Sequence, residues 1–539
     1  MAELTRFLAA ALAAAFTVAQ SAEKPVQPAE VADALRRVVH DRVGLVDVYA
    51  PTGFAPLWLN ADLAVLNNEA YEAIQLIESA ANEGLDPADY HVVEVRAFAA
   101  ALREHPGQPD VVARLDSALS EAMLRYVHDL HMGRIDPRDL GVTLDVSGDA
   151  HEFATLLRDA VAGGRLVETA RAWAPLGSQY PALNAALAWY RTLALRGPVE
   201  LLPIHSAVHP GERYGSLGPL RERLVLLGDL DPGGSSTDQD IYEGAIVDGV
   251  KRFQRRHGLE PDGVLGTQTL AQFAVPLEWR ARQLELAMER LRWLPHLGDE
   301  RLVLVNIPMF RLFASDSTSP TGSPSFTSDV IVGRAHKTET PEFAATLTEI
   351  QFRPYWNVPA SILRKEILPQ LAREPDYLGR EQMELVAGQG DASPVVPATD
   401  ENLLRLRRGG LRLRQRAGPA NALGLIKFLI PNEHDVYMHA TPAPALFARS
   451  RRDFSHGCVR VADPVGLAEW VLKTEPGWGR QRITAAMDAS EPSRVSVRSA
   501  VRVMLFYSTA AVLPDSGDVV FADDIYGRDA PLDRALRER

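Results

Sequence analysis

The residue best suited to nucleophilic chemistry is Cys458, the only cysteine in a chain of 539 residues. It ends the sequence Ser455-His456-Gly457-Cys458, and Arg460 follows two residues later. A lone thiol is often a small buried hydrophobe, so a core role is the alternative. Here the glycine permits close approach of the backbone to a ligand, and the cationic neighbour favours the thiolate. This segment is therefore the first candidate for a reactive site.

A cysteine nucleophile needs a base, usually an imidazole within hydrogen-bond distance. Two histidines lie near Cys458 in sequence, His439 and His456. His439 ends a short run typical of a strand, which stops before Pro442, so a rigid element would hold its side chain. We therefore predict His439 as the base. A turn at Gly457 makes the direction of His456 unpredictable, so His456 stays open as the alternative base, and a structural role is open for either histidine.

A histidine followed some way on by Ser-His-Gly-Cys, an apolar residue and an arginine resembles the signature of the L,D-transpeptidases with a YkuD-type catalytic domain. The resemblance implies that Cys458 attacks a peptidoglycan stem peptide and that His439 is the base. It also implies an oxyanion hole built from the backbone amides of His456, Gly457 and Cys458. The family more often has glycine or serine after the upstream histidine. This chain has Ala440, so a backbone carbonyl would have to orient the imidazole.

Four more residues are candidate substrate contacts: Ser455, Arg460, Trp356 and Tyr437. Trp356 would line a stem-peptide cleft, with a buried aromatic at a strand end as the equal alternative. The resemblance implies a donor tetrapeptide and an acceptor stem as partners, and carbapenem β-lactams as inhibitors. Thiol, imidazole and oxyanion hole suffice for acyl transfer, so no metal or organic cofactor is expected.

The expected reaction joins the third residues of two stem peptides through a thioester on Cys458. Two alternatives remain open at this stage. An L,D-carboxypeptidase would use water in place of the acceptor amine, and a structural protein of the wall would keep the fold without activity. The presence of both Cys458 and His439 favours an enzyme over the structural protein.

The first 22 residues resemble a signal peptide, because Arg6 precedes an apolar run over residues 7–18. That run is shorter than the roughly 20 residues of a membrane-spanning helix. Glu3 offsets Arg6, so an uncleaved anchor at the membrane, or an amphipathic start of a cytoplasmic protein, are the alternatives. We expect an exported protein of the periplasm or cell envelope.

The remaining sequence predicts a multidomain α+β chain. Residues 23–215 are predicted as a helical scaffold domain, with apolar residues at three- and four-residue steps from Val112 to Leu130. This region resembles the scaffold of large multidomain L,D-transpeptidases. Within it, Trp58 and its neighbours are expected to be core rather than ligand-binding.

A small module is predicted at residues 216–277, with three short helices and tight Gly-rich loops. It resembles the widespread peptidoglycan-binding domain, although a packing module without affinity for the wall is the alternative. A linker helix is expected over residues 278–300. The β-rich, YkuD-type catalytic domain follows at 301–490, with a helical lid insertion at 361–423 and a β-hairpin extension at 491–539.

Composition is ordinary for globular protein, with 46% hydrophobic and 24% charged residues. The net charge of -13 argues against nucleic acid as a partner, because binding to phosphates requires excess positive charge. Membrane contact is expected only through an uncleaved N-terminal segment.

Overall fold

The structure is a computed structural model that describes residues 27–144, 153–175, 177–197, 202–203, 206–233, 240–294, 301–316 and 324–539. The predicted signal peptide at residues 1–22 lies outside the described residues. The chain is a multidomain α+β protein, as predicted. It divides into two compact units, one of residues 1–81, 85–129 and 151–173, and the other of residues 82–84, 130–150 and 174–539.

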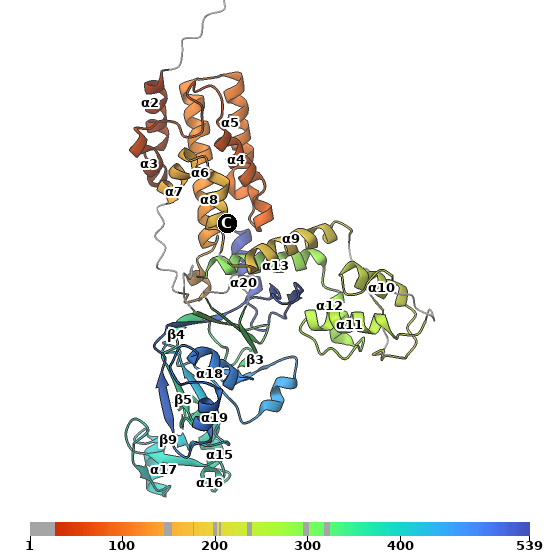
Figure 1. Ribbon diagram of the computed structural model, residues 1–539, viewed down its shortest axis with the longest axis vertical. Helices are drawn as coiled ribbons and strands as arrows, with labels where there is room; N and C mark the ends of the chain where they lie inside the picture. The colour runs from red at the N-terminus through yellow and green to blue at the C-terminus, as the bar shows by residue number, and fades with distance from the viewer. Residues whose placement is uncertain are drawn as a thin grey trace, which may run out of the picture. The chain divides into compact units, whose positions relative to one another are not determined.

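The first unit is helical. Its helices are α2 (Pro28–Val39), α3 (Val43–Tyr49), α4 (Asn68–Glu78), α5 (Val92–Glu104), α6 (Pro109–Met132), α7 (Phe153–Ala162) and α8 (Leu166–Trp173), with single 3-10 turns at Ala50–Thr52 and Pro87–Tyr90 (Figure 1). The apolar stripe predicted on α6 is buried along its length, from Val112 to Leu130. The apolar residues recur every three or four positions, so they form one stripe along the helix. Burial of this stripe against the other helices stabilises α6.

A buried polar network anchors the loop that follows α3. The carboxylate of Asp116 accepts hydrogen bonds from the Tyr49 hydroxyl at 2.6 Å and from the backbone amide of Trp58 at 2.9 Å. The Trp58 indole donates to the Ser120 hydroxyl at 2.8 Å, and its side chain is fully buried. Trp58 is therefore a core residue, as the sequence favoured, because α6 satisfies its only polar atom.

In the second unit, two helices pack side by side: α9 (Gln179–Ala194) and α13 (Leu277–Arg292) (Figure 1). The sequence predicted α9 as part of the scaffold at 23–215 and α13 as the linker helix at 278–300; contacts group both helices with the second unit. The side chains of Arg290 and Arg292 on α13 are almost completely buried. Charged residues can be buried there because partners distant in sequence satisfy them, such as Asp529, 2.6 Å from Arg290.

The predicted three-helix module consists of α10 (Leu217–Leu226), α11 (Ala245–Arg256) and α12 (Thr267–Phe273). Its Gly-rich loop is held by the buried Gln254 side chain, which donates to Asp262 at 2.8 Å and accepts from the amide of Gly263 at 2.8 Å. These residues of the module therefore build its fold rather than an exposed binding surface.

Within the described residues, eleven strands form the main sheet of the second unit. Their order is β14-β5-β10-β11-β13-β3-β2-β1-β15-β4, and β12 also pairs with β3. The strands are β1 (Arg301–Asn306), β2 (Arg311–Ser315), β3 (Phe326–Gly333), β4 (Phe343–Thr346), β5 (Glu349–Phe352), β10 (Ile426–Leu429), β11 (Met438–His439), β12 (Asp453–Ser455), β13 (Val459–Val461), β14 (Ser493–Ser496) and β15 (Val501–Phe506). Helices α18 (Pro464–Leu472) and α19 (Arg480–Asp488) contribute to its apolar core.

The segment after residue 490 was expected to be a hairpin extension, but two of its strands belong to the main sheet. Strand β15 pairs in parallel with β1 and antiparallel with β4, and β14 extends the sheet beside β5. The reason is visible in β15, where Val501, Val503, Met504 and Leu505 are all fully buried. A strand that is apolar on both faces needs cover on both sides, which a surface hairpin lacks.

The predicted lid insertion contains helices, as expected, together with a small sheet of its own. Its helical parts are α14 (Ala360–Ile362), a π-helical turn η5 (Leu363–Ile367), α15 (Leu368–Leu371), α16 (Tyr377–Arg380) and α17 (Asp400–Arg407). The sheet has the order β6-β9-β7-β8, formed by β6 (Trp356–Asn357), β9 (Arg412–Gln415), β7 (Met383–Val386) and β8 (Val395–Val396). A separate apolar cluster fills this insertion, so it folds around its own core.

Residues 510–537, which we call the clasp, connect the parts of the second unit. The clasp contains the hairpin β16 (Ala510–Val512) and β17 (Val519–Phe521) and the helix α20 (Asp529–Arg537). Buried Phe521 stacks near the ring of His257 on the module and lies under the guanidinium of Arg280 on α13. The carbonyl of Val519 accepts a hydrogen bond from Arg256 at 3.0 Å. The clasp therefore fastens the module to α13.

Candidate active site

The nucleophile candidate lies in a tight turn between β12 and β13. The strand before the turn pairs in parallel with β3, and the strand after it pairs antiparallel with β3, so both ends of the turn are fixed to one strand. Gly457 has a φ of 115°, which side chains other than glycine rarely adopt. The sequence therefore needs glycine immediately before Cys458, whose side chain is partly exposed.

Hydrogen bonds inside the turn hold its shape. The Ser455 hydroxyl donates to the carbonyl of Cys458 at 2.5 Å and accepts from the amide of Gly457 at 3.1 Å. Ser455 is buried, so the structure places this predicted substrate contact inside the turn. The Gly457 amide, one of three predicted oxyanion donors, is occupied by that hydroxyl. Among the described residues, no acceptor is found for the amides of His456 and Cys458.

Three neighbouring strands bring the functional side chains to one face of the sheet. His439 on β11 is in register with Lys427 on β10 and with Arg460 on β13. Side chains on one strand alternate between faces, so Tyr437 and Cys458, each two residues before these partners, share the same face. The structure therefore brings the predicted base, nucleophile and arginine together.

His439 is buried and oriented by the backbone. Its Nδ1 lies 2.6 Å from the carbonyl of Ala440, to which it donates, and the backbone of Leu423 is a second hydrogen-bond partner of the ring. The carbonyl that orients the imidazole is that of Ala440, the residue that stands where the family more often has glycine or serine. Burial, with the positive charges of Arg460 and Lys427, lowers the pKa of His439 to about 3. The imidazole is therefore neutral at physiological pH.

Burial also raises the pKa of the Cys458 thiol, while Tyr437, Lys427 and Arg460 act in the opposite direction. The thiol contacts the carbonyl of Asp435 at 3.9 Å. Its hydrogen bonds among the described residues go to Asp435 and Tyr437 and not to His439. The resting site is thus a neutral thiol beside a neutral imidazole, and a rotation of the thiol has to precede proton transfer. Such contacts often form only in the substrate complex.

His456, the alternative base, faces a different partner. Its Nε2 lies 2.8 Å from the carboxylate of Glu366, which belongs to the π-helical turn η5 of the lid insertion. Both side chains are substantially exposed, so this ion pair contributes little to stability. It does join the turn that carries Cys458 to the lid insertion. His456 thus contacts the lid insertion, whereas His439 shares its face of the sheet with Cys458.

Two of the predicted substrate contacts form an aromatic wall beside the thiol. The Trp356 indole, on β6 of the lid sheet, donates a hydrogen bond to the hydroxyl of Tyr437, which in turn contacts Cys458. The ammonium of Lys427 lies 4.0 Å from the centre of the Tyr437 ring, a cation–π contact. Arg460 is partly buried, and its buried Nε has no hydrogen-bond partner among the described residues.

Sequence reasoning missed Lys427, although a signal was present. The run Ile426-Lys427-Phe428-Leu429 carries one charge in an otherwise apolar strand, just before the strand of His439. A lone lysine at the second position of such a run faces away from the core. Burial lowers the pKa of Lys427, and the nearby Cys458 opposes this effect. Lys427 is therefore placed to stabilise negative charge on the sulfur.

Thr340 supports the turn from the other side and was also missed as a site residue. Its hydroxyl donates to the carbonyl of Gly457 at 2.8 Å and accepts from the amide of Gly333 at 2.8 Å. The hydroxyl of Tyr526, which comes from the clasp, accepts from the Thr340 amide at 3.2 Å and donates to the carbonyl of Gly333 at 2.6 Å. A Cβ at Gly333 would lie 2.0 Å from the carbonyl of Thr338. The backbone of residues 338–340 therefore approaches Gly333 too closely for any side chain at that position.

The described residues contain no group of three or more metal-binding side chains. No helix among them is long and apolar enough to cross a membrane. The site itself combines a partly exposed thiol, a neutral imidazole and two cations on one face of the sheet, an arrangement suited to nucleophilic chemistry at the sulfur.

Three parts of the chain match known domain families. Residues 300–484 match the L,D-transpeptidase catalytic domain (YkuD), residues 217–273 match the "Putative peptidoglycan binding domain", and residues 44–187 match the scaffold domain. Cys458, His439, Lys427 and Thr340 all lie within the first of these ranges.

A protein of Haemophilus influenzae named "Putative L,D-transpeptidase" is 32% identical over 255 residues, which is 47% of this chain and 49% of that protein. The match thus spans about half the length of this relative. Two solved structures are also similar. An L,D-transpeptidase from Xylanimonas cellulosilytica is 16% identical with a TM-score of 0.17, covering 56% of this chain and 99% of that one. One from Mycobacterium smegmatis is 13% identical with a TM-score of 0.18, covering 38% and 58%.

Proposed function

We propose that this chain cross-links peptidoglycan through a thioester on Cys458. Its residues 300–484 match the L,D-transpeptidase catalytic domain (YkuD) and its residues 217–273 match a putative peptidoglycan-binding domain, which supports the proposal. The observation that carries this proposal is the shared face of β10, β11 and β13, which presents Lys427, His439, Cys458 and Arg460 together. The donor is a tetrapeptide stem and the acceptor is the side-chain amine of a second stem.

In the first step, Nε2 of His439 takes the proton from the Cys458 thiol as the sulfur attacks the donor carbonyl. The pKa of His439, lowered to about 3 by burial and by Arg460, keeps the resting imidazole unprotonated, and this pKa has to rise in the substrate complex for the imidazole to hold the thiol proton. The amides of Cys458 and His456 stabilise the oxyanion, and the Gly457 amide contributes only if it leaves the Ser455 hydroxyl. Collapse breaks the peptide bond, and the terminal D-Ala leaves with the proton from His439.

In the second step, the acceptor amine attacks the thioester and His439 removes its proton. The bond between the new carbonyl and nitrogen forms as the bond to sulfur breaks, which returns the thiol. Arg460 is placed to bind a stem carboxylate, and Trp356 with Tyr437 forms one wall of the cleft. Lys427 stabilises the sulfur as it carries negative charge.

We further propose that the module at 217–273 holds the enzyme on the wall and that the protein works in the cell envelope. Linking a weak wall-binding module to the catalytic domain raises the local concentration of stem peptides. The module's match to a peptidoglycan-binding family supports this role. A packing role is the alternative, because Phe521 of the clasp covers part of the module.

The test is mass spectrometry of muropeptides incubated with the purified chain. We expect a dimer joined through third residues, release of D-Ala and a transient mass increase on the protein, all absent in Cys458→Ala. Tripeptide products without dimers would indicate an L,D-carboxypeptidase. Unchanged muropeptides from the folded wild-type chain would refute an enzymatic role. Carbapenem β-lactams are expected to acylate Cys458 in the same assay.

A further inference from the structure

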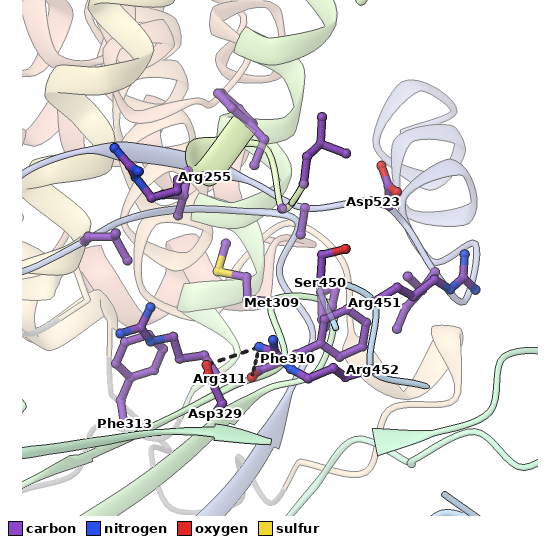
Figure 2. Close-up of a pocket in the computed structure, with 18 residues that line it drawn as sticks. Arg255, Met309, Phe310, Arg311, Phe313, Asp329, Ser450, Arg451, Arg452 and Asp523 are labelled. Atoms are coloured by element: carbon purple, nitrogen blue, oxygen red, sulfur yellow. Dashed lines mark hydrogen bonds and ion pairs between the residues drawn. The ribbon is translucent and has the colours of Figure 1, made fainter. Parts of the chain in front are cut away.

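A cavity of about 260 Å³ lies at the junction of the module, the main sheet and the clasp, and we call it the junction cavity. Figure 2 shows side chains from these three regions around it. Arg255 comes from α11 of the module, Arg311 begins β2, and Asp523 belongs to the clasp. None of the five residues on the face that carries Cys458 lines it. The cavity is therefore a place separate from the candidate active site.

The charge of the junction cavity is opposite to that of the chain. Four arginines and two aspartates line it, so its net charge is +2 in a chain whose net charge is -13. The arginines are Arg255, Arg311, Arg451 and Arg452, and the aspartates are Asp329 and Asp523. A local excess of cations in an acidic protein favours an anionic ligand.

Ion pairs neutralise three of these six charges. Arg452 pairs with Asp329 at 3.1 Å, and Arg451 pairs with Asp453 at 2.7 Å. Asp523 accepts a hydrogen bond from the side chain of Gln272 at 2.8 Å. Arg255 and Arg311 are the two lining arginines that these pairs leave without an anionic partner.

Arg255 and Arg311 form no ion pair and no side-chain hydrogen bond within the described residues. The Nε of Arg311 is buried without a partner, which is costly for a polar atom. Arg311 also lies close enough to Arg452 to lower its pKa, so two guanidinium groups repel each other there. An anion beside Arg311 would offset this repulsion and satisfy the buried nitrogen.

The rest of the lining is apolar. Met309, Phe310 and Phe313 come from the β1–β2 hairpin, Leu259 from the module and Leu513 from the clasp. A simple inorganic anion would leave this surface unused. The combination of two available guanidinium groups with an apolar wall fits a carboxylate that is attached to a small apolar residue.

We propose that the junction cavity is a second ligand site, which binds the terminal carboxylate of a peptide through Arg255 and Arg311 while the terminal apolar side chain packs on Met309 and Phe310. The peptide is a stem of peptidoglycan, an identification that rests on the proposed function. A free amino acid such as D-Ala carries the same carboxylate, so the experiment distinguishes the two sources.

The cavity is held open by contacts that do not involve the two arginines. The clasp is fastened to the module through Arg256 and Val519, and to α12 through Gln272 and Asp523. The loop at Arg452 donates to the carbonyl of Phe310 at 3.1 Å and continues through β12 to the nucleophile turn. A stem bound there would lie between the module and the catalytic domain.

The test measures equilibrium binding of a fluorescent tetrapeptide stem with a free terminal carboxylate to the full chain carrying Cys458→Ala, which prevents turnover. We expect two classes of site. The variant Arg255→Gln/Arg311→Gln should lose one of them, with affinity at that site weakened about 100-fold, and Arg255→Gln alone should weaken it about tenfold. The matched control Arg171→Gln/Arg534→Gln removes two exposed charges elsewhere and should bind as the parent does.

Two further probes identify the group that is recognised. The same tetrapeptide with an amidated terminus should lose the second site in the parent chain. If D-Ala competes at that site as well as the tetrapeptide does, the cavity binds the amino acid and the carboxylate assignment stands. Equal stoichiometry and affinity in the folded double variant, or full binding of the amidated peptide, would overturn the proposal. Arg255 is exposed, so its single variant gives a result even if the double variant fails to fold.

The proposed function is assayed separately through the mass of the wild-type chain after incubation with the tetrapeptide. If no acyl-enzyme forms while both binding sites are intact, the proposed acyl transfer is refuted and the proposed ligand site in the cavity stands. If the acyl-enzyme forms but the double variant binds the peptide as the parent does, the proposed ligand site is refuted and the proposed acyl transfer stands.

Discussion

Replacing Thr340 with valine tests whether the turn that carries Cys458 is held from outside. Valine has nearly the same shape as threonine but lacks the hydroxyl. The change removes two hydrogen bonds of 2.8 Å, one to the carbonyl of Gly457 and one from the amide of Gly333. Thr340 is 1% exposed, so water cannot replace the lost partner. Both backbone groups are then left unsatisfied in the protein interior.

An unsatisfied buried polar group costs about 1–3 kcal/mol, so two of them give about 2–6 kcal/mol. We expect the free energy of unfolding to fall by about 2–4 kcal/mol, because the loop can relax part of the way. The carbonyl of Gly457 belongs to the same peptide unit as the amide of Cys458, so its rotation misdirects an oxyanion donor. We expect acylation to slow about 10- to 100-fold, which corresponds to about 1.4–2.8 kcal/mol in the barrier.

The assay combines urea unfolding with single-turnover acylation by a soluble donor peptide. The substrate concentration for half-maximal rate should change little, because Thr340 supports the turn and does not contact the substrate. Thr340→Ser keeps the hydroxyl and should recover most of the rate. The control Thr348→Val alters an exposed threonine of the same domain and should leave both measurements unchanged. A destabilised Thr340→Val chain that acylates at the wild-type rate would show that the turn keeps its geometry without this hydroxyl.

Three further predictions concern the site and the first unit. His439→Ala should abolish acylation, whereas His456→Ala should reduce it less than tenfold, because His456 contacts the lid insertion through an exposed ion pair. Lys427→Met removes a cation that favours the thiolate, so the pKa of Cys458 should rise further and alkylation by iodoacetamide should shift to higher pH. Asp116→Ala should lower the free energy of unfolding of the first unit by about 3–5 kcal/mol, because the backbone amides of Leu57 and Trp58 lose their acceptor in the interior.

Each of these has a clear contrary result. Equal losses in the two histidine variants, or a larger loss for His456→Ala, would reassign the base. An alkylation profile of Lys427→Met that matches the wild type would remove the lysine from the electrostatics of the thiol. Unfolding of Asp116→Ala within 1 kcal/mol of the wild type, on the scale of a surface substitution, would mean that the loop after α3 finds other partners.

The sequence was sufficient to single out Cys458 as the candidate nucleophile, because the evidence for it is local. A lone cysteine, a glycine at a turn and a histidine at a strand end all lie within 20 residues. The Ala440 carbonyl could be anticipated for the same reason, since it is adjacent to the imidazole it orients.

Features that depend on distant partners could not be predicted in the same way. The hydroxyl of Thr340 bonds a carbonyl 117 residues away, and Tyr526 is 193 residues from the glycine it contacts. Threonine and tyrosine have no periodic pattern that predicts such pairs. The burial of Arg290 could not be predicted either. A helix with several arginines is typical of an exposed linker, and the partner that permits burial, Asp529, is distant in sequence.

The clasp has a consequence for the order in which the chain can mature. The module lies near residue 250, but the Phe521 ring that covers His257 is made more than 260 residues later. At a synthesis rate of about 5–20 residues per second, that interval lasts about 13–50 seconds. During this time the face of α11 and α13 that receives Phe521 is uncovered, and Arg280 lacks the ring beneath it. The second unit can therefore close only after the clasp has been made, and a protease acting earlier would find the module's inner face open.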